Sequence, residues 1–305
     1  MSPPGRMVSV IVPGEFAEWR SRVDGEEGRS WVAALPELVR QLCVDWGLTL
    51  DDTPPEHGGS GLVVMAHRRH QACALKVSWP TGTTADEARA LRTWDGAGAV
   101  RLLGARPDIG GLLMERLNQR RSLRGLGLWE AAEVAGTLLR RLAVPAPPGL
   151  RSLGEIADDM VERLPSRQRT LGDPIPPAWL DTARGLAADL GAEDHGTLIH
   201  ADLHYGNVLA GEREPWLAVD PRPVRGRPEF SVPELLWTRA DDDAIGSDAD
   251  LRRLLAMLVE TGELEPRAAN GWAVARCVDY WLWGLENGLT TDPVRCHRVL
   301  GALLG

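Results

Sequence analysis

The change of residue pattern along the chain constrains its fold most. Between residues 48 and 79, short apolar runs alternate with turns, and the glycine-rich residues 58–61 separate two of these runs. This pattern is typical of antiparallel strands joined by tight turns. Residues 13–46 and most of the chain beyond residue 117 instead repeat apolar residues at the spacing of one helix face. The sequence therefore predicts a leading helix, a β-rich part and a mainly helical remainder that one short hairpin at residues 207–219 interrupts. Three of the helices expected in this remainder are 122–142, 153–164 and 179–190.

The composition excludes two classes of partner. The formal net charge of −9 would repel the phosphates of a nucleic acid and suits a cationic small molecule instead. No run of about 18 apolar residues could span a membrane, and residues 1–16 have no apolar run after a basic start, so we expect neither a membrane segment nor a signal peptide. The cysteines form no Cys-x-x-Cys pair, which favours reduced thiols in a cytoplasmic protein over a zinc site. These cysteines are Cys43, Cys73, Cys277 and Cys296.

Lysine is almost absent from this chain. Of 34 basic residues only Lys76 is a lysine, and it lies in the apolar run 72–77 that follows the glycine turn. An ammonium is a compact point charge whereas a guanidinium is a wide planar fork, so a lone lysine marks a position where arginine could not serve. The alternative is an accident of composition. Glu87, on the next helix, is the acid placed to pair with Lys76, or else it caps that helix together with Thr84.

The stretch from His200 to Asn207 carries the most chemical information. It reads Asp-Leu-x-x-x-Asn with a histidine two residues before the aspartate, which is the pattern of a kinase catalytic loop. Phosphoryl transfer needs a carboxylate to accept the proton of the attacking hydroxyl and an oxygen ligand for magnesium, and we assign these roles to Asp202 and Asn207. Asp220 ends the apolar run 216–219 and is expected to be the second magnesium ligand.

Two other interpretations apply to the same residues. His200, Asp202 and His204 form His-x-Asp-x-His, which could bind a metal for hydrolysis, although the remaining histidines form no second cluster. The glycine turn could be a plain hairpin turn. The kinase interpretation is favoured because it alone accounts for the strand lysine, the helix acid, the catalytic loop and the strand-terminal aspartate in this order.

With these residues identified, the chain resembles the aminoglycoside phosphotransferases, specifically the streptomycin 6-kinase and hydroxyurea phosphotransferase branch. The resemblance extends from about residue 26 to residue 290. It includes stretches outside the catalytic residues, namely 26–29, 144–150, 213–221 and 286–290. It implies a two-lobed, protein-kinase-like α+β fold. Residues 1–116 would form an N-lobe with an antiparallel sheet, and residues 117–305 a mainly helical C-lobe.

The resemblance also implies an activity and its cofactors. The protein is expected to transfer the γ-phosphoryl group of ATP, with Mg²⁺, to a hydroxyl of an aminoglycoside, streptomycin first among them. The glycine turn would cover the phosphates through Gly59, Ser60 and Gly61, and the connector from Glu115 to Leu117 would hydrogen-bond the adenine. Alternatives are a kinase of another small molecule (hydroxyurea, a sugar, an amino alcohol or a peptide antibiotic) and a relative that binds nucleotide without transferring phosphate.

The late helix offers acids for a cationic substrate. Streptomycin carries two guanidinium groups on the ring that this family phosphorylates, and guanidinium groups pair with carboxylates and stack on aromatic faces. Asp279, Trp283 and Glu286 are spaced by four and three residues, so they share one helix face. We therefore predict Glu286 and then Asp279 as substrate acids. The aspartates at 241–243 are interpreted as a solvated loop, and Trp281 and Trp283 are open to either core packing or substrate contact.

The chain departs from its relatives after Asp220. Relatives usually read Gly-Asp-Pro, a short gap and Phe-Asp, whereas this chain has Arg227 and Ser231 in place of the two acids. Ser231 is expected to cap the helix that follows. Arg227 reverses a charge near the site, which puts the substrate in question and motivates the non-catalytic alternative.

Overall fold

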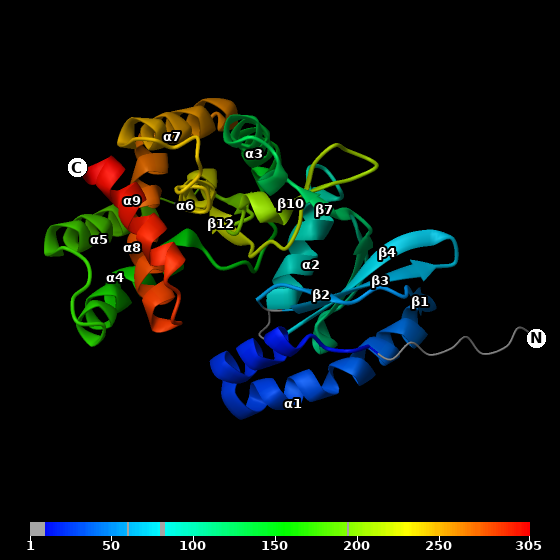
Figure 1. Cartoon of the computed structure of the whole chain (residues 1–305). Helices are drawn as coiled ribbons and strands as arrows, with labels where there is room; N and C mark the ends of the chain where they lie inside the picture. The colour runs from blue at the N-terminus through cyan, green and yellow to red at the C-terminus, as the bar shows by residue number, and fades with distance from the viewer. Residues whose placement is uncertain (1–9, 60, 80–82, 194) are drawn as a thin grey trace, which may run out of the picture. The chain divides into compact units, whose positions relative to one another are not determined.

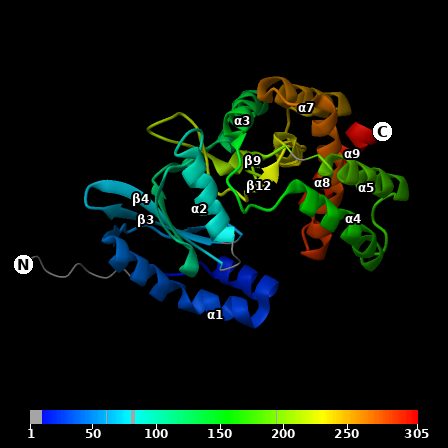
Figure 2. The same ribbon diagram turned by 180° about the vertical axis from the view of Figure 1, so that it is seen from behind.

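The computed structural model describes residues 10–59, 61–79, 83–193 and 195–305, and the chain divides into two compact units. The first unit comprises residues 1–96 and 100–117, and the second comprises residues 97–99 and 118–305. Figures 1 and 2 show the sheet and the helices of the first unit and the many helices of the second. The expected order, a leading helix and antiparallel strands before a mainly helical part, is confirmed.

One antiparallel sheet organises the first unit. Its main path runs β1-β3-β4-β6-β5, and the short strand β2 pairs with the outer end of β3. Lys76 lies near the end of β4, between Val63 of β3 and Leu112 of β6, so strands on both sides fix its position. The strands are β1 (Leu48–Leu50), β2 (Glu56–His57), β3 (Gly61–Arg68), β4 (Gln71–Ser78), β5 (Leu102–Arg106) and β6 (Gly111–Glu115).

Two helices use opposite faces of this sheet. Helix α1 (Gly14–Trp46) changes direction at Gly25, whose φ is 59°, and buries Leu35, Val39 and Leu42 against alternate residues of β3 and β4. Successive strand residues point to opposite faces. Lys76 therefore lies on the other face, where helix α2 (Thr83–Trp94) supplies its partner Glu87.

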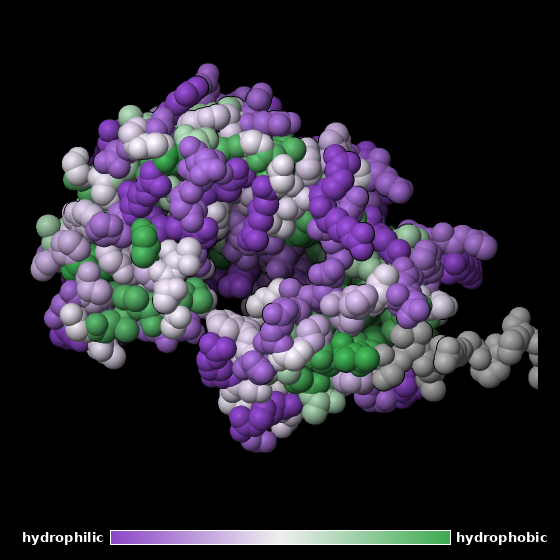
Figure 3. Space-filling model, viewed as in Figure 1, coloured by the Kyte–Doolittle hydropathy of each residue, from purple (hydrophilic) through white to green (hydrophobic). Residues whose placement is uncertain are grey.

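The second unit is a group of helices around α8 (Pro266–Glu286), which contacts α4, α5, α6, α7 and α9 and buries the large side chain of Trp272. On the face shown in Figure 3, hydrophilic side chains cover most of these helices and apolar side chains form small groups between them. The other helices are α3 (Leu128–Leu142), α4 (Leu153–Thr170), α5 (Pro177–Gly191), α6 (Val232–Trp237), α7 (Asp248–Gly262) and α9 (Thr291–Leu304).

Two small three-stranded sheets complete this unit, in the orders β11-β10-β7 and β12-β9-β8. The segment 200–207 runs from β9 to β10, and the segment 219–223 returns from β11 to β12. Both segments therefore connect the same two sheets, which brings them together. The strands are β7 (Asn118–Ser122), β8 (Val144–Pro145), β9 (Thr197–Ile199), β10 (Val208–Ala210), β11 (Leu217–Ala218) and β12 (Val224–Gly226). Short 3₁₀ helices are η1 (Pro107–Ile109), η2 (Leu123–Gly125), η3 (Tyr205–Asn207) and η4 (Pro228–Ser231).

Two predicted helix boundaries are wrong, and one of them is the end of the helix 153–164, which continues through Pro165 to Thr170. The helix expected to begin at Ser122 begins at Leu128, because residues 118–122 form strand β7 and pair with β10 across the unit. Pairing with a strand some 90 residues away leaves no periodic signal in the local sequence. The four cysteines are free thiols, as expected. Within the described part of the chain, every helix is too short or too polar to cross a bilayer.

Candidate active site

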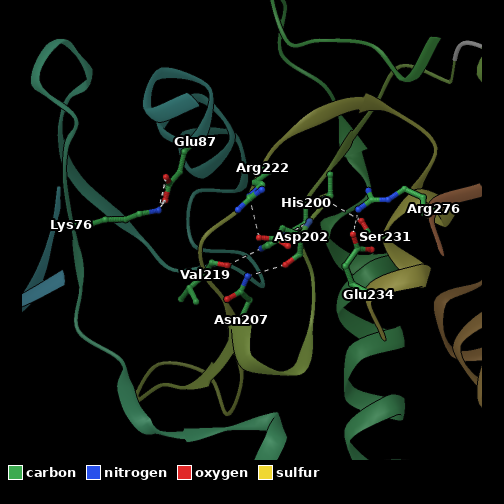
Figure 4. Close-up of polar contacts among 11 residues, drawn as sticks. Lys76, Glu87, His200, Asp202, Asn207, Val219, Arg222, Ser231, Glu234 and Arg276 are labelled. Carbon is green, nitrogen blue, oxygen red and sulfur yellow. Dashed lines mark hydrogen bonds and ion pairs between the residues drawn. The ribbon is translucent and has the colours of Figure 1, made fainter. Parts of the chain in front are cut away.

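In the first unit, Lys76 and Glu87 form a buried ion pair. The Lys76 ammonium lies 2.8 and 2.7 Å from the two carboxylate oxygens of Glu87, and only 5% of each residue is exposed. Figure 4 shows the Lys76 side chain extended from its strand toward Glu87 on the helix. Glu87 therefore does not pair with Thr84, whose hydroxyl has no hydrogen-bond partner within the described ranges. The ion pair therefore holds the Lys76 ammonium in a fixed position on the face of the sheet where α2 lies.

The glycine turn between β2 and β3 is tied to α1. The Gly58 N–H donates to the Gly61 carbonyl at 3.1 Å, and the Gly59 carbonyl accepts from Trp19 at 3.2 Å and from Arg20 at 3.0 Å. A Cβ atom at Gly61 would lie 3.1 Å from the Val77 carbonyl oxygen, so this position favours glycine. Ser60 lies outside the described residues.

The connector after β6 is anchored to the sheet by two residues. The Glu115 N–H donates to the Arg101 carbonyl at 3.0 Å, and the Glu115 carboxylate accepts from the Arg101 N–H at 2.7 Å. Arg116 donates to the Ala66 carbonyl at 2.6 Å and pairs with Asp51 at 2.7 Å. Leu117 is buried. The contacts of Glu115 and Arg116 thus hold the backbone of the connector next to the sheet.

In the second unit, the catalytic loop has an unusual backbone at its start. Ala201, directly before Asp202, has a φ of 55°, which is costly for a residue with a Cβ atom. Its N–H donates to the Ser231 hydroxyl at 3.1 Å. The side-chain amide of Asn207 donates to the Asp202 carbonyl at 2.9 Å and so closes the loop (Figure 4). These two hydrogen bonds fix the backbone on both sides of the Asp202 carboxylate.

The segment that carries Asp220 is hydrogen-bonded to the catalytic loop at both of its ends. The Val219 N–H donates to the Asn207 carbonyl at 2.8 Å, and His200 Nε2 donates to the Val219 carbonyl at 3.0 Å. The Arg222 N–H donates to the His200 carbonyl at 2.9 Å. Asp220 itself has a φ of 56°. The unit therefore brings together Asp202, Asn207 and Asp220, three residues selected from the sequence.

Arg222 is a residue of this site that sequence reasoning did not select. Its Nε lies 3.3 Å from Asp202 Oδ2, and its side chain is two-thirds exposed (Figure 4). The negative charges of Asp202 and then Asp220 raise the pKa of the Arg222 guanidinium. The only sequence signal was its place two residues after Asp220. A solvated cation beside the two carboxylates is suited to contact a phosphoryl group.

The interpretation as a metal-dependent hydrolase is wrong. His204 Nδ1 accepts from the Gly206 N–H at 3.0 Å, and burial lowers the pKa of His204 to about 4. His200 uses Nε2 on the Val219 carbonyl, so the two histidines are engaged in holding the loop. Across the ranges that the structure describes, no three histidine, cysteine, aspartate or glutamate side chains could together bind a metal ion.

Both departures from the relatives have a structural account. Arg227 is buried and pairs with Glu193 at 2.5 Å and with Glu229 at 3.2 Å, so its reversed charge is neutralised locally. Ser231 does not cap α6, contrary to the expectation, because its hydroxyl accepts the Ala201 N–H instead. The replacement of the second acid therefore still provides an oxygen that holds the catalytic loop.

Glu234, in the first turn of α6, was also missed from the sequence. It is 2% exposed and forms an ion pair with Arg276 of α8, while its Oε2 atom has no hydrogen-bond partner among the described residues. Burial raises the pKa of Glu234 to about 8, against the opposing effect of the Arg276 charge. The negative charge of Asp202 raises it further. Glu234 is therefore within the electrostatic reach of the catalytic loop.

The predicted substrate acids both contact one arginine. Arg167 of α4 donates to Asp279 at 2.6 Å and to Glu286 at 2.9 Å, and each acid remains about one-third exposed. Trp283 on the same face is 37% exposed. Trp281 is buried and packs edge-on against His297, which settles it as a core residue.

Comparisons with known proteins agree with this geometry. A family model described as aminoglycoside/hydroxyurea antibiotic resistance kinase matches residues 45–288. Streptomycin 6-kinase of Streptomyces griseus is 42% identical over 290 residues, which cover 92% of this chain and 93% of that protein. Hydroxyurea phosphotransferase of Kitasatospora aureofaciens is 38% identical over 301 residues, which cover 97% of this chain and 86% of that protein.

A solved structure of much lower sequence identity also shares this fold. The crystal structure of aminoglycoside phosphotransferase APH(4)-Ia matches with a TM-score of 0.62 at 13% identity, over 88% of this chain and 98% of that one. At this identity the match shows the fold alone, and it confirms the expected kinase-like α+β fold. Because the family model covers most of the chain and the curated relatives nearly all of it, the chain belongs to the aminoglycoside/hydroxyurea antibiotic resistance kinases.

Proposed function

We propose that this protein transfers the γ-phosphoryl group of ATP, with Mg²⁺, to a hydroxyl of streptomycin, at the 6-position that names its relative. The proposal depends most on the nearly full-length similarity to streptomycin 6-kinase, together with an intact catalytic loop. We propose that residues 1–116 form the nucleotide lobe and residues 117–305 the catalytic and substrate lobe. An enzyme that uses ATP belongs in the cytoplasm, and we place it there.

Asp202 is the proposed catalytic base. Its carboxylate is partly exposed, and the hydrogen bonds of Ala201 and Asn207 fix the backbone around it. A carboxylate held this way can orient the attacking hydroxyl and accept its proton as the bond to phosphorus forms. The Arg222 guanidinium, 3.3 Å from Asp202 Oδ2, places a positive charge beside the proposed base.

Asn207 and Asp220 are the proposed holders of Mg²⁺. The Asn207 amide nitrogen is engaged with the Asp202 carbonyl, so its carbonyl oxygen is the atom left to serve as a ligand. One amide oxygen and one carboxylate suit a magnesium ion that takes its other ligands from phosphates and water. Bound Mg²⁺ would neutralise charge on the β- and γ-phosphates during transfer.

The nucleotide contacts are assigned to the first unit. The ammonium of Lys76, oriented by Glu87, would bind the α- and β-phosphates. The backbone of Gly59, Ser60 and Gly61 would cover the phosphates, and the backbone of Glu115 and Leu117 would hydrogen-bond the adenine. Each role stays a prediction that nucleotide affinities of single variants can test.

Asp279 and Glu286 remain the proposed substrate acids. Arg167 binds one oxygen of each, and two carboxylates with one guanidinium leave a formal charge of −1 on the cluster. The cluster can therefore still attract a cation. Glu286→Gln should raise KM for streptomycin and leave KM for ATP unchanged.

A transfer assay tests the proposed function directly. The protein is incubated with [γ-³²P]ATP and Mg²⁺ and with streptomycin, other aminoglycosides or hydroxyurea, and the labelled product is separated and identified. We expect label in streptomycin, with Asp202→Asn as the inactive control. Label in another acceptor but none in streptomycin would contradict the proposed substrate while leaving the kinase chemistry intact.

Hydroxyurea is the second candidate acceptor, because a hydroxyurea phosphotransferase is 38% identical over nearly the whole chain. The same assay separates the two. The alternative of a relative that binds nucleotide without transferring phosphate was motivated by the reversed charge of Arg227. Glu193 and Glu229 neutralise that charge, so the motivation no longer holds. A thermal shift with ATP, combined with no label in any acceptor, would restore it.

A further inference from the structure

A buried arginine in the first part of helix α1 holds the glycine turn. Only 6% of Arg20 is exposed, and its Nη1 atom donates to the Gly59 carbonyl at 3.0 Å. The Trp19 indole N–H donates to the same carbonyl oxygen at 3.2 Å. Two donors from neighbouring residues of one helix therefore converge on a single backbone oxygen of the turn.

Arg20 is itself held from several sides. Its Nη2 atom pairs with Asp24, one helical turn further along α1. The centre of the guanidinium lies 4.9 Å from the Trp79 ring and 5.9 Å from the Trp31 ring, and these two rings pack edge-on at 5.2 Å. Guanidinium groups are attracted to aromatic faces. These contacts together fix the orientation in which Nη1 points to Gly59.

The backbone of α1 brings Arg20 to this place. The helix changes direction at Gly25, and a Cβ atom at Gly28 would clash with the Arg20 carbonyl oxygen, so this close approach favours glycine. On the other side of Arg20, Phe16 is buried and its ring lies 5.3 Å from that of His57, the last residue of β2 before the turn. The first part of α1 is therefore packed against the strand that leads into the turn.

The same contacts link the turn to the strand of Lys76. Gly61, where the turn ends, pairs with Ser78 of β4, and Trp79 directly follows that strand. Arg20 therefore contacts two elements that we assign to the phosphates. It contacts the glycine turn through a hydrogen bond, and the end of β4 through the Trp79 ring. All of these residues belong to the first unit.

A glycine-rich turn needs this kind of support. Gly58 and Gly59 are exposed, and glycine loses more conformational freedom on ordering than any other residue. If the turn were mobile, the binding of phosphates would have to order it, and this entropy loss would weaken the affinity. A turn that α1 already orders avoids most of that loss.

We propose that Arg20 is a positioning residue for the ATP phosphates, which raises nucleotide affinity by holding the glycine turn through the Gly59 carbonyl. This inference rests on the proposed function, in which the turn covers the phosphates. Arg20 lies ahead of residues 45–288, the part of the chain that the family model matches. The inference therefore gives helix α1 a role in nucleotide binding in addition to its packing against the sheet.

The variant Arg20→Met tests the inference. It keeps an apolar side chain beside the tryptophan rings but removes the donor to Gly59. We expect the Kd for MgATP, measured by calorimetry, to rise about tenfold, as for a lost hydrogen bond from a charged donor. The Kd for adenosine should stay at the wild-type value, because adenosine has no phosphates for the turn to cover. An equal loss of affinity for both ligands would indicate a general disturbance of the unit and would overturn the inference.

Two further variants of the same helix complete the series. Trp19→Phe keeps an aromatic ring but removes the second donor to Gly59, so the Kd for MgATP should rise about threefold. Arg40→Met is the matched control, because Arg40 is an exposed arginine of α1 that pairs with Glu37. It should bind MgATP as the wild type does. A Kd for MgATP that is the same in Arg20→Met as in Arg40→Met would contradict the role of Arg20.

Hydrogen exchange of the wild-type protein covers a variant that does not fold. If the contact with Gly59 favours ATP binding, ATP binding must stabilise that contact, because coupling between binding and a second equilibrium is reciprocal. MgATP should therefore slow amide exchange in residues 18–24 by about threefold or more, whereas adenosine should not. The same exchange rates in this segment with and without MgATP would overturn the inference.

The inference and the proposed function can fail separately. A wild-type protein that binds MgATP but transfers phosphate to no acceptor contradicts the proposed function, and the affinities for MgATP and adenosine then still decide the role of Arg20. Phosphorylation of streptomycin by Arg20→Met with the wild-type KM for ATP would leave the proposed function in place and overturn the inference.

Discussion

Lys76 and Asp202 are held in contrasting ways. Lys76 lies in strand β4 between two paired neighbours, and its ammonium meets both oxygens of Glu87. Asp202 follows a residue with a positive φ in a loop between two small sheets, and side-chain hydrogen bonds from Ser231 and Asn207 hold that loop. Regular structure thus fixes the charge that we assign to ATP, whereas individual side chains fix the proposed base. Single substitutions should therefore disturb the loop around Asp202 more easily than the position of Lys76.

The largest effect is expected at the proposed base. Asp202→Asn keeps the size of the side chain but cannot accept the proton, so kcat should fall roughly 10²–10⁴-fold, the usual scale for a lost general base. ATP affinity, measured by calorimetry, should stay near the wild-type value. A kcat equal to that of wild type would remove Asp202 from the mechanism.

Lys76→Arg tests the position that regular structure fixes, namely that of the Lys76 ammonium. A guanidinium is too wide for a buried position shaped around one ammonium and two carboxylate oxygens, so ATP affinity or turnover should fall about tenfold or more, equal to roughly 1.4 kcal/mol. The measurement is KM for ATP and kcat with saturating acceptor. Wild-type values in this variant would mean that the single lysine is an accident of composition.

Ser231→Ala tests the side-chain support of the loop. The substitution leaves the buried Ala201 N–H without its acceptor, which costs about 1–3 kcal/mol of folding free energy. We expect kcat to fall several-fold, with KM for ATP less affected. Ser231→Thr keeps the hydroxyl and should retain most activity. Equal kcat in Ser231→Ala and wild type would show that the loop holds its shape without this bond.

The last expected effect is on stability alone and is a pH dependence of unfolding at Glu234. Its folded-state pKa of about 8 lies above the ordinary value of 4.5, so the folded state binds more protons between these values. Its contribution is fully present below about pH 4.5 and is lost as the pH rises through 8, with a slope of up to about 1.4 kcal/mol per pH unit. Urea unfolding at pH 5.5 and pH 8 should therefore show a larger loss in wild type than in Glu234→Gln. Parallel losses in the two proteins would contradict the shifted pKa.

The sequence predicted features whose signals are local. The catalytic loop lies within eight residues and the glycine turn within four, and the helix faces repeat over short windows. The order of the β-rich and helical parts and the grouping of Asp202 with Asn207 and Asp220 followed from these signals, whereas the two-lobed fold class followed from the resemblance to the family.

Features that depend on distant partners could not be predicted. Arg167 meets Asp279 across 112 residues, and Ser231 meets Ala201 across 30, so neither contact changes a local pattern. The distant partner of Ser231 also explains why the prediction of a helix cap was wrong. A serine directly before a helix commonly caps it, and the local sequence shows no other partner. Strand β7 was missed because its partner β10 lies far along the chain.

The buried pair of Lys76 and Glu87 also provides a spectroscopic probe of nucleotide binding. Because the chain has a single lysine, growth on ¹⁵N-labelled lysine should give one side-chain ammonium signal, from the group that we assign to the nucleotide phosphates. The two short contacts to Glu87 should slow proton exchange enough to observe that signal. A titration with ATP would then report the occupancy of one site without assignment of a spectrum.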